Sequence, residues 1–368
     1  MRKGKGFILS RLVIIFLIIP LFFFPACQKE TRVAEEGKGP KILVYYDFEG
    51  ISNVCTPEQI LFRAARYQEA REFLTEDINA AIRGLVRGGA EEIVVTDAHG
   101  SGNPEPDIIL DKMDKSAVLE LRDEPFDPYI VSPNSTYHGI VTIGMHAYAG
   151  STGVLSHTYT IHTMLKVNGQ EFNEPDIIAL SASRFDVPLI MVSGDDILEK
   201  QVKNLHPQTE FAVVKTAKGK TDADFPPREE ALKRIEEAAF NAVQRIEEIP
   251  PFKLDPPYRM EFSFQTERQT DIAANYPGLT RIDNCTLGLE SSDFVEAYQV
   301  WTKLIDLSSL DNPQIYLNTM EGKEYLQEVV TEGRKALLER WLAPGFFRDE
   351  RKPEEAEKKG ERKYQGAQ

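Results

Sequence analysis

The chain has 368 residues, enough for a large hydrophobic core and more than one domain. Hydrophobic residues make up 42% of it and charged residues 27%, which is typical of a globular protein. The formal net charge is −15, and it becomes −19 without the four cations of residues 1–26. So acidic a surface repels phosphate backbones, and we therefore exclude nucleic acid as a partner.

The N-terminus has the pattern of an export signal. Residues 1–11 are basic, residues 12–24 are apolar, and the small residue Ala26 precedes Cys27. A cysteine at this place resembles the lipid-modified cysteine of bacterial lipoproteins, so we expect residues 1–26 to be removed and Cys27 to carry a lipid anchor. The alternative is an uncleaved N-terminal anchor, for which the apolar run is short. Both alternatives place the body of the protein in the cell envelope, outside the cytoplasmic membrane.

Residues 27–40 are polar and predict a tether. After it, short apolar runs rich in β-branched residues alternate with helical patterns, which favours a mainly parallel sheet. Helices are expected from Thr56 to about Arg87, at residues 175–185 and at residues 227–248. Strands are expected at residues 41–47, 91–100, 139–146, 187–196 and 210–216.

A proline-rich connector at residues 249–259 precedes a second set of elements, with strands at 259–264 and 286–291 and helices at 292–307 and 322–342. The sequence therefore predicts an α/β fold, in which a mainly parallel sheet flanked by helices carries the functional site, beside a smaller α+β domain. The predicted ranges are a signal peptide at 1–26, a tether at 27–40, a metal-binding catalytic domain at 41–205, a second domain at 206–345 and a disordered charged tail at 346–368.

Three predicted strands end at residues of types that can bind metal ions. These are Asp47 and Glu49, then Asp97 and His99, then His146. Ligands of open parallel sheets gather beyond the carboxyl ends of the strands, so these groups should converge. Two adjacent carboxylates repel each other unless a cation or a proton lies between them. Mixed nitrogen and oxygen ligands without a nearby cysteine favour zinc, with manganese or cobalt as alternatives. Taken singly, each acid could instead cap a turn.

The glycine-containing loop after His146 presents His157, a candidate acid or base beside the metal. The alternative for His157 is a substrate-binding or surface position.

The two remaining cysteines, Cys55 and Cys285, could form one disulfide, but two unpaired buried thiols are the favoured interpretation.

Four blocks resemble the signatures of the M55 family of metallopeptidases, the D-aminopeptidases of the DppA type. They are "DFEGIS" at 47–52, "VTDAHGSG" at 95–102, "IGMHAYAGSTGVLSHT" at 143–158 and "DVPLIMVSGDD" at 186–196. The later segments "ANYPGLTRID" and "DFVEAYQ" also resemble that family, so the resemblance spans about residues 41–310.

The resemblance implies two divalent metal ions, which we expect to be zinc. It also implies the release of N-terminal D-amino acids from short peptides. By resemblance the ligands are Asp47 (the bridge), Glu49, His99, His146 and Glu174, and the catalytic residue is His157. Glu171 and Asp176 are rivals of Glu174. The resemblance also implies a homo-oligomer. An envelope-anchored peptide-binding protein, or another metal-dependent amidase on this fold, is the alternative function.

Four further residues match no ligand of the family. Asp97 is expected either to orient a ligand or to cap its turn. His138, His162 and His206 are expected to be structural or exposed.

Overall fold

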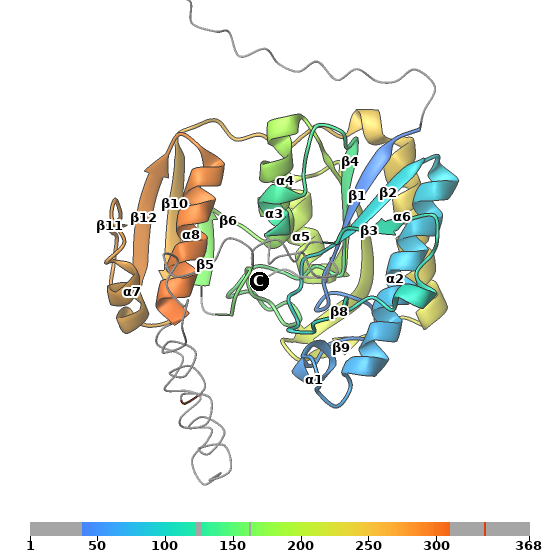
Figure 1. Cartoon of the computed structure of the whole chain (residues 1–368), viewed down its shortest axis with the longest axis horizontal. Coiled ribbons are helices and arrows are strands. Elements are labelled where there is room, and N and C mark those ends of the chain that lie inside the picture. Colours follow the sequence, from blue (N-terminus) through green and yellow to red (C-terminus); the bar gives the residue numbers. More distant parts are fainter. Residues whose placement is uncertain (1–38, 122–126, 162, 310–334, 336–368) are drawn as a thin grey trace, which may run out of the picture. The chain divides into compact units, whose positions relative to one another are not determined.

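The computed structural model describes residues 39–121, 127–161, 163–309 and 335. A seven-stranded sheet has the strand order β3-β2-β1-β4-β7-β8-β9 (Figure 1). All of its neighbours pair in parallel except β8 and β9. Its strands are β1 (Lys41–Tyr46), β2 (Glu92–Asp97), β3 (Val118–Leu119), β4 (Gly139–Ile143), β7 (Leu189–Asp195), β8 (Glu210–Gly219) and β9 (Asp222–Asp224).

A five-stranded antiparallel sheet has the order β11-β12-β10-β5-β6. Its strands are β5 (Thr163–Val167), β6 (Gln170–Glu171), β10 (Tyr258–Phe264), β11 (Thr280–Arg281) and β12 (Thr286–Ser291). The predicted α/β class, with a mainly parallel sheet and a smaller α+β part, is confirmed.

The helices are α1 (Pro57–Ile60), α2 (Tyr67–Gly88), α3 (Pro128–Val131), α4 (Glu174–Ala182), α5 (Asp196–Leu205), α6 (Arg228–Gln244), α7 (Glu267–Ala273) and α8 (Phe294–Ser308), with short 3₁₀ turns η1 (Leu110–Lys112), η2 (Ser183–Phe185) and η3 (Ile246–Glu248). In the described part of the chain, no helix is long and apolar enough to cross a membrane. Apart from residue 335, the predicted helix at 322–342 lies outside the described residues. The predicted signal, lipidation site and tail also lie outside them, as does most of the tether.

Two predicted boundaries differ from the structure. The single helix expected from Thr56 to Arg87 is wrong, because the chain leaves the helical conformation after Ile60, passes through Arg63 at φ 67° and starts again at Tyr67. The predicted domain boundary between residues 205 and 206 also does not separate the two sheets. Strands β8 and β9 belong to the parallel sheet, whereas β5 and β6 belong to the antiparallel one.

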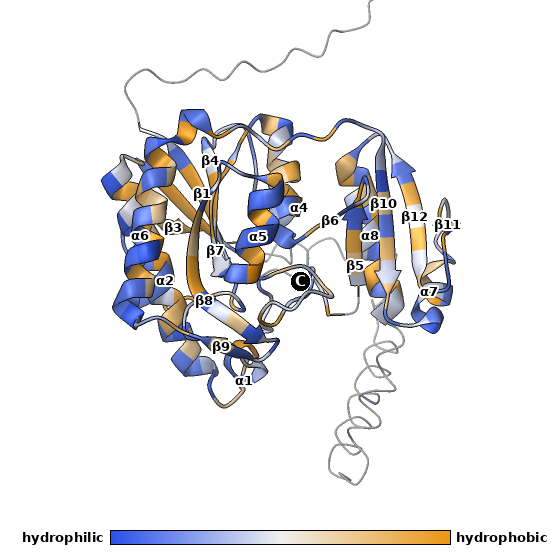
Figure 2. Ribbon diagram, turned by 180° about the vertical axis from the view of Figure 1, so that it is seen from behind, coloured by the Kyte–Doolittle hydropathy of each residue, from blue (hydrophilic) through white to orange (hydrophobic). Residues whose placement is uncertain are grey.

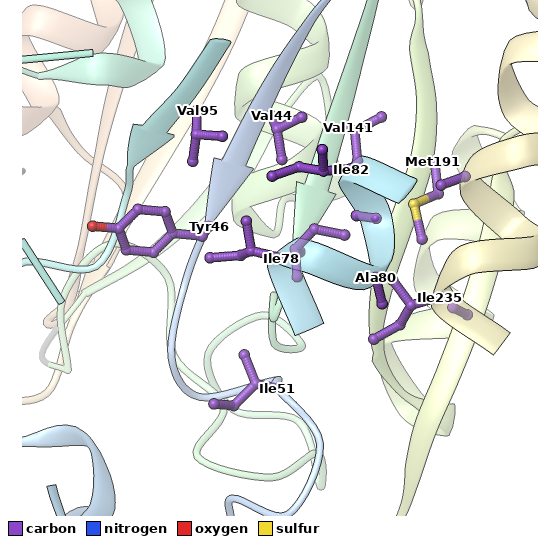
Figure 3. Close-up of a cluster of buried hydrophobic side chains, with 14 of the residues drawn as sticks. Val44, Tyr46, Ile51, Ile78, Ala80, Ile82, Val95, Val141, Met191 and Ile235 are labelled. Atoms are coloured by element: carbon purple, nitrogen blue, oxygen red, sulfur yellow. The ribbon is translucent and has the colours of Figure 1, made fainter. Parts of the chain in front are cut away.

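The parallel sheet is buried on both faces, which explains its nearly continuous apolar strands. Alternate residues of β1 point to opposite sides. Val44 packs in a cluster with α2 and α6, while Tyr45 packs in a second cluster with α4 and with residues of the antiparallel sheet. Figure 3 shows the first cluster, in which Val95 and Val141 of the neighbouring strands lie near Ile78 of α2.

The covering helices α2 and α6 carry both hydrophilic and hydrophobic residues along their lengths (Figure 2). Their buried residues recur at helical spacing, as in Leu74, Ile78, Ile82 and Leu85 of α2. One face of each helix therefore closes the core, and the sheet below them is held as a rigid platform for the loops at its carboxyl edge.

Candidate metal centre

Three neighbouring strands deliver the predicted metal-binding residues to one edge of the parallel sheet. Strand β1 lies between β2 and β4, and Tyr46 at its end pairs with both Asp97 and Ile143. The segments that leave these strand ends carry the predicted ligands Asp47, Glu49, His99 and His146, all of them buried or nearly so. The predicted ligands therefore converge at one edge of the sheet, as the strand order requires.

His99 forms the first group with two carboxylates. Its Nδ1 lies 3.0 Å from Oδ1 of Asp47 and 3.0 Å from Oε2 of Glu49. Its Nε2 lies 3.0 Å from the carbonyl oxygen of Ile60. Because a carbonyl only accepts, Nε2 carries a hydrogen, and Nδ1 is the nitrogen that points at the two acids. A backbone acceptor that orients a metal-binding imidazole in this way is common in metal sites.

His146 forms the second group. Its Nε2 lies 3.2 Å from Oδ2 of Asp47 and 3.2 Å from Oε1 of Glu174. Its Nδ1 lies 3.2 Å from the carbonyl oxygen of Ala147 and 3.5 Å from the backbone nitrogen of His157, and these contacts leave the other nitrogen facing the carboxylates. Asp47 therefore gives one oxygen to each group, which is the geometry expected of a bridging carboxylate.

Glu174 begins α4, directly after the N-cap residue Asn173. Its carboxylate accepts hydrogen bonds from the Tyr129 hydroxyl at 2.6 Å and from the backbone N–H of Tyr159 at 2.6 Å. These two donors aim the buried carboxylate at His146.

The rivals of Glu174 lie elsewhere. Asp176 accepts the backbone N–H of Asn173 and lies 2.8 Å from the ring of His206, while the half-buried Glu171 faces Lys166. Of the three acids considered from sequence, the structure brings Glu174 to His146.

Three buried atoms of the site make only ion-pair contacts, without hydrogen-bond geometry, in the described part of the chain: Oδ2 of Asp47, Oε2 of Glu49 and Nε2 of His146. Unpaired buried polar atoms are rare in proteins, and three in one site require an explanation. All three belong to groups that bind divalent metal ions. One ligand atom each from Asp47, Glu49 and His99 lies within 4.8 Å of the other two, so these residues fit around a cation.

In the metal-free site, burial and neighbouring charges shift the pKa values of the acids and histidines. Burial and the neighbouring Glu49 charge raise the pKa of Asp47 to about 6, against the opposing effect of His146 and His99. Burial would raise the pKa of Glu174 too, but the nearby His146 outweighs it and lowers that pKa to about 2. Burial would lower the pKa of His99, but the Glu49 charge raises it well above its ordinary value. The pKa of His146 is likewise raised, by Glu174, so without metal His99 and His146 hold protons that neutralise the acids.

His157 stacks on His146, with ring centroids 4.0 Å apart and an angle of 15° between the ring planes. Its Nδ1 lies 2.8 Å from the carbonyl oxygen of Leu155. That nitrogen therefore carries the hydrogen, and Nε2 is the acceptor of the neutral ring. A ring nitrogen of His157 also lies within 4.8 Å of ligand atoms of His146 and Glu174. The structure thus brings His157 to the same site as the predicted ligands.

A family model described as Peptidase_M55, D-aminopeptidase, matches residues 41–303, well over half of the chain. The chain belongs to the M55 family. It is a metallopeptidase by that membership. A D-aminopeptidase of Bacillus subtilis (strain 168) is 27% identical over 273 residues, which cover 73% of this chain and 97% of the relative.

The solved structure of the Zn-dependent D-aminopeptidase DppA from Bacillus subtilis, described as a self-compartmentalizing protease, shares the fold of this M55 peptidase. The TM-score is 0.68 at 24% identity, over 73% of this chain and 97% of that one.

The remaining sequence predictions around the M55 site have these outcomes. Oδ1 of Asp97 accepts the backbone N–H of His99 at 2.8 Å, so the turn that it caps is the one that presents a candidate ligand. His138 accepts the backbone N–H of Lys41 at 3.1 Å, and His206 is buried against Asp176. Both are structural, as expected. His162 lies outside the described residues.

The thiols of Cys55 and Cys285 are free and partly buried. They are unpaired, as expected, but not fully buried as the favoured interpretation had it.

Sequence inspection missed three residues that contact the segments carrying the M55 site. Tyr129 holds Glu174, as described above. Asp195, at the end of β7, accepts the backbone N–H of Val154 at 2.7 Å in the loop that carries His157. Lys215 of β8 donates to backbone carbonyls of the segment that carries Glu49. All three act across long sequence separations, and only the "SGDD" run around Asp195 gave a local signal, that of a helix start.

A cavity of about 440 Å³ opens at the site. Asp47, Glu49, His99, His157 and Glu174 contribute to its lining. The rest is mainly apolar or small and consists of Pro57, Ile60, Leu61, Ala98, Gly100, Ser101, Leu155, Tyr159, Thr160 and Ile161. This combination of a few converging polar groups and an apolar wall is typical of a small-molecule site.

Proposed function

We propose that this M55 peptidase is a zinc-dependent aminopeptidase that releases N-terminal D-amino acids from short peptides through a binuclear centre. The observation that carries the proposal is the position of Asp47, whose two oxygens face two separate groups of metal-binding side chains. The names of the similar proteins, a D-aminopeptidase and a Zn-dependent D-aminopeptidase, support the choice of metal and substrate.

In this proposal Glu49 and His99 hold one ion, His146 and Glu174 hold the other, and Asp47 is shared between them. Bound zinc supplies Lewis acidity toward a peptide carbonyl and toward water. The chain's own contribution is orientation, because Tyr129 and the backbone of residues 60, 147 and 159 hold the ligands at the positions given above.

His157 is the proposed catalytic residue. The hydrogen bond from its Nδ1 to Leu155 leaves the Nε2 lone pair available, and stacking on His146 restricts the ring. Nε2 could take a proton and return it to the leaving amine, or it could attack the carbonyl directly. Both roles place a neutral imidazole beside the scissile bond.

The cavity supports short substrates with small apolar side chains. Its volume of about 440 Å³ suits a ligand of a few residues. Two lining residues, Leu61 and Ile161, are 52% and 77% exposed, so an apolar substrate would cover hydrophobic surface there. We therefore propose D-alanyl peptides as the substrate class.

The direct test measures zinc content and the hydrolysis of D-Ala-D-Ala and L-Ala-L-Ala, each with and without a chelator. We expect about two zinc ions per chain and cleavage of the D-substrate, abolished by the chelator. The variant His157→Ala should lose turnover but keep zinc, whereas Asp47→Ala should lose zinc. Normal turnover by His157→Ala would overturn the catalytic assignment, and unchanged zinc in Asp47→Ala would overturn the ligand assignment.

The same assay separates the alternatives. Peptide binding without hydrolysis would favour an envelope-anchored binding protein. Chelator-sensitive hydrolysis confined to other amides would favour a different metal-dependent amidase on this fold.

We also propose that the protein is exported and lipid-anchored through Cys27 in the cell envelope, where D-amino-acid peptides occur in the wall polymer. The full-length chain should then fractionate with membranes and the variant Cys27→Ser should not. Equal fractionation of both would refute lipidation.

A homo-oligomer is proposed by analogy with the self-compartmentalizing relative, and a measurement of mass in solution tests it.

A further inference from the structure

Lys215 is a buried lysine with no role in the chemistry proposed above. It lies on β8, and only 1% of its surface is exposed. Its Nζ donates to the carbonyl oxygens of Glu49 at 2.5 Å, of Ile51 at 3.0 Å and of Val54 at 2.5 Å. An ammonium group has three hydrogens, so these three carbonyls use its full donor capacity.

A buried charge needs a structural reason. Burial lowers the pKa of Lys215 to about 8, against the nearby acids and Cys55, which shows the strain of removing the ammonium from water. An apolar side chain of the same length would fill this space without that strain. What an apolar side chain lacks is the ability to bind three carbonyls of residues 49–54, which we call the Glu49 segment.

The Glu49 carboxylate has little else to position it. Its Oε2 lies 3.0 Å from His99 but receives no hydrogen bond from the described residues. Glu174 differs, because Tyr129 and Tyr159 each donate to one of its oxygens. The place of Glu49 in the site therefore depends on its backbone.

That backbone is held from two further sides. The N–H of Gly50 donates to the carbonyl of Gly144 at 2.7 Å, and a Cβ at position 50 would lie 1.8 Å from the carbonyl oxygen of Met145, so only glycine fits there. Ser52 donates from its N–H and its hydroxyl to the buried Asp77. Lys215 is the contact that acts on Glu49 itself.

We propose that Lys215 is a positioning residue of the metal centre, which holds the Glu49 segment so that the Glu49 carboxylate faces His99. The inference rests on the metal centre proposed above. It assigns to Lys215 a specific effect on the ion held by Glu49 and His99, with a smaller effect on the ion held by His146 and Glu174.

The test compares Lys215→Met with the matched control Lys218→Met in the full-length chain. Lys218 lies on the same strand but is exposed, where it pairs with Asp224. Zinc titration should show one of two ions bound about 10–100-fold more weakly in Lys215→Met, the range typical for loss of a residue that orients a ligand. Lys218→Met should bind zinc as the wild type does. Excess zinc should restore turnover in Lys215→Met.

A second measurement is independent of metal and of activity. In the metal-free protein, amide hydrogen exchange of a peptide that covers residues 49–54 should be faster in Lys215→Met than in Lys218→Met. If Lys215→Met does not fold, Lys215→Gln, which keeps two donors, takes its place. Unfolding of both variants would overturn the proposal in favour of a general role in folding.

Zinc affinity within twofold of the control, in a folded variant, would also overturn it. A wild type that binds no zinc would overturn the metal centre itself, and unchanged exchange of the Glu49 segment would then reject Lys215 as its anchor.

Discussion

Asp195 offers a quantitative test of how the loop with His157 is held. Its buried carboxylate caps α5 by accepting the N–H groups of Ile197 at 3.1 Å and Leu198 at 2.8 Å, and it also accepts the N–H of Val154 at 2.7 Å. Loss of a helix cap costs about 1 kcal/mol. An unpaired buried N–H that had a charged partner costs a further 1–3 kcal/mol, roughly. Asp195→Ala should therefore lower the free energy of unfolding by about 2–4 kcal/mol.

Asp293 is the matched control. It caps α8 through the N–H groups of Val295 and Glu296 but binds no third amide in the described part of the chain. Asp293→Ala should cost only about 1 kcal/mol. Urea denaturation of both variants at equal zinc concentration measures the difference, and turnover should fall in Asp195→Ala alone. A difference below about 0.5 kcal/mol would refute the reasoning that the loop depends on Asp195.

Two further predictions concern the ligands. Burial raises the pKa of Asp47 from 3.8 to about 6, so between about pH 4 and pH 6 the folded state binds the proton that the unfolded chain releases, and the metal-free protein loses stability as pH rises through that window. At pH 7, Asp47→Asn should thus have a higher free energy of unfolding than the metal-free wild type, by up to about 3 kcal/mol at about 1.4 kcal/mol per pKa unit. Below pH 4 it should have no advantage. Equal stability of the two proteins at pH 7 in urea denaturation would contradict this. Tyr129→Phe should lower unfolding free energy by about 1.5–3 kcal/mol, because it removes a hydrogen bond to the Glu174 carboxylate, whereas Tyr45→Phe, which removes one to the neutral Pro128 carbonyl, should cost about 1 kcal/mol. Equal losses in the two tyrosine variants would count against a charged Glu174.

Local sequence patterns were sufficient for the strands that carry the site. Apolar β-branched runs ending at Tyr46, Asp97 and Ile143 mark strands buried on both faces, and such strands pair in parallel with their ends at one edge. Phe48 is fully buried in the core between two acids that face the site, as residues of alternating direction require. The placement of Asp47, Glu49, His99 and His146 followed from these local facts.

The supporting contacts did not follow, because they join residues far apart in sequence. Lys215 and Glu49 are separated by 166 positions, and Tyr129 and Glu174 by 45. A single lysine within an apolar strand gives no sign of what its ammonium binds. The same limit explains the domain boundary, since β5 joins the antiparallel sheet only by pairing with β10, which lies almost a hundred residues later.

Two paired residues of β7 and β8 connect the two halves of the site. Asp195 and Lys215 are register partners on these neighbouring strands. One is a buried acceptor that binds an N–H of the loop carrying His157, and the other is a buried donor that binds carbonyls of the Glu49 segment. Glu49 and His157 both line the cavity. Their relative position therefore depends in part on two paired strands, about 4.8 Å apart, whose register shifts at Asp195, and not only on the loops themselves. Opposite charges on adjacent, paired strands are thus a means of holding the proposed metal ligand Glu49 and the proposed catalytic residue His157, from two separate loops, in one geometry.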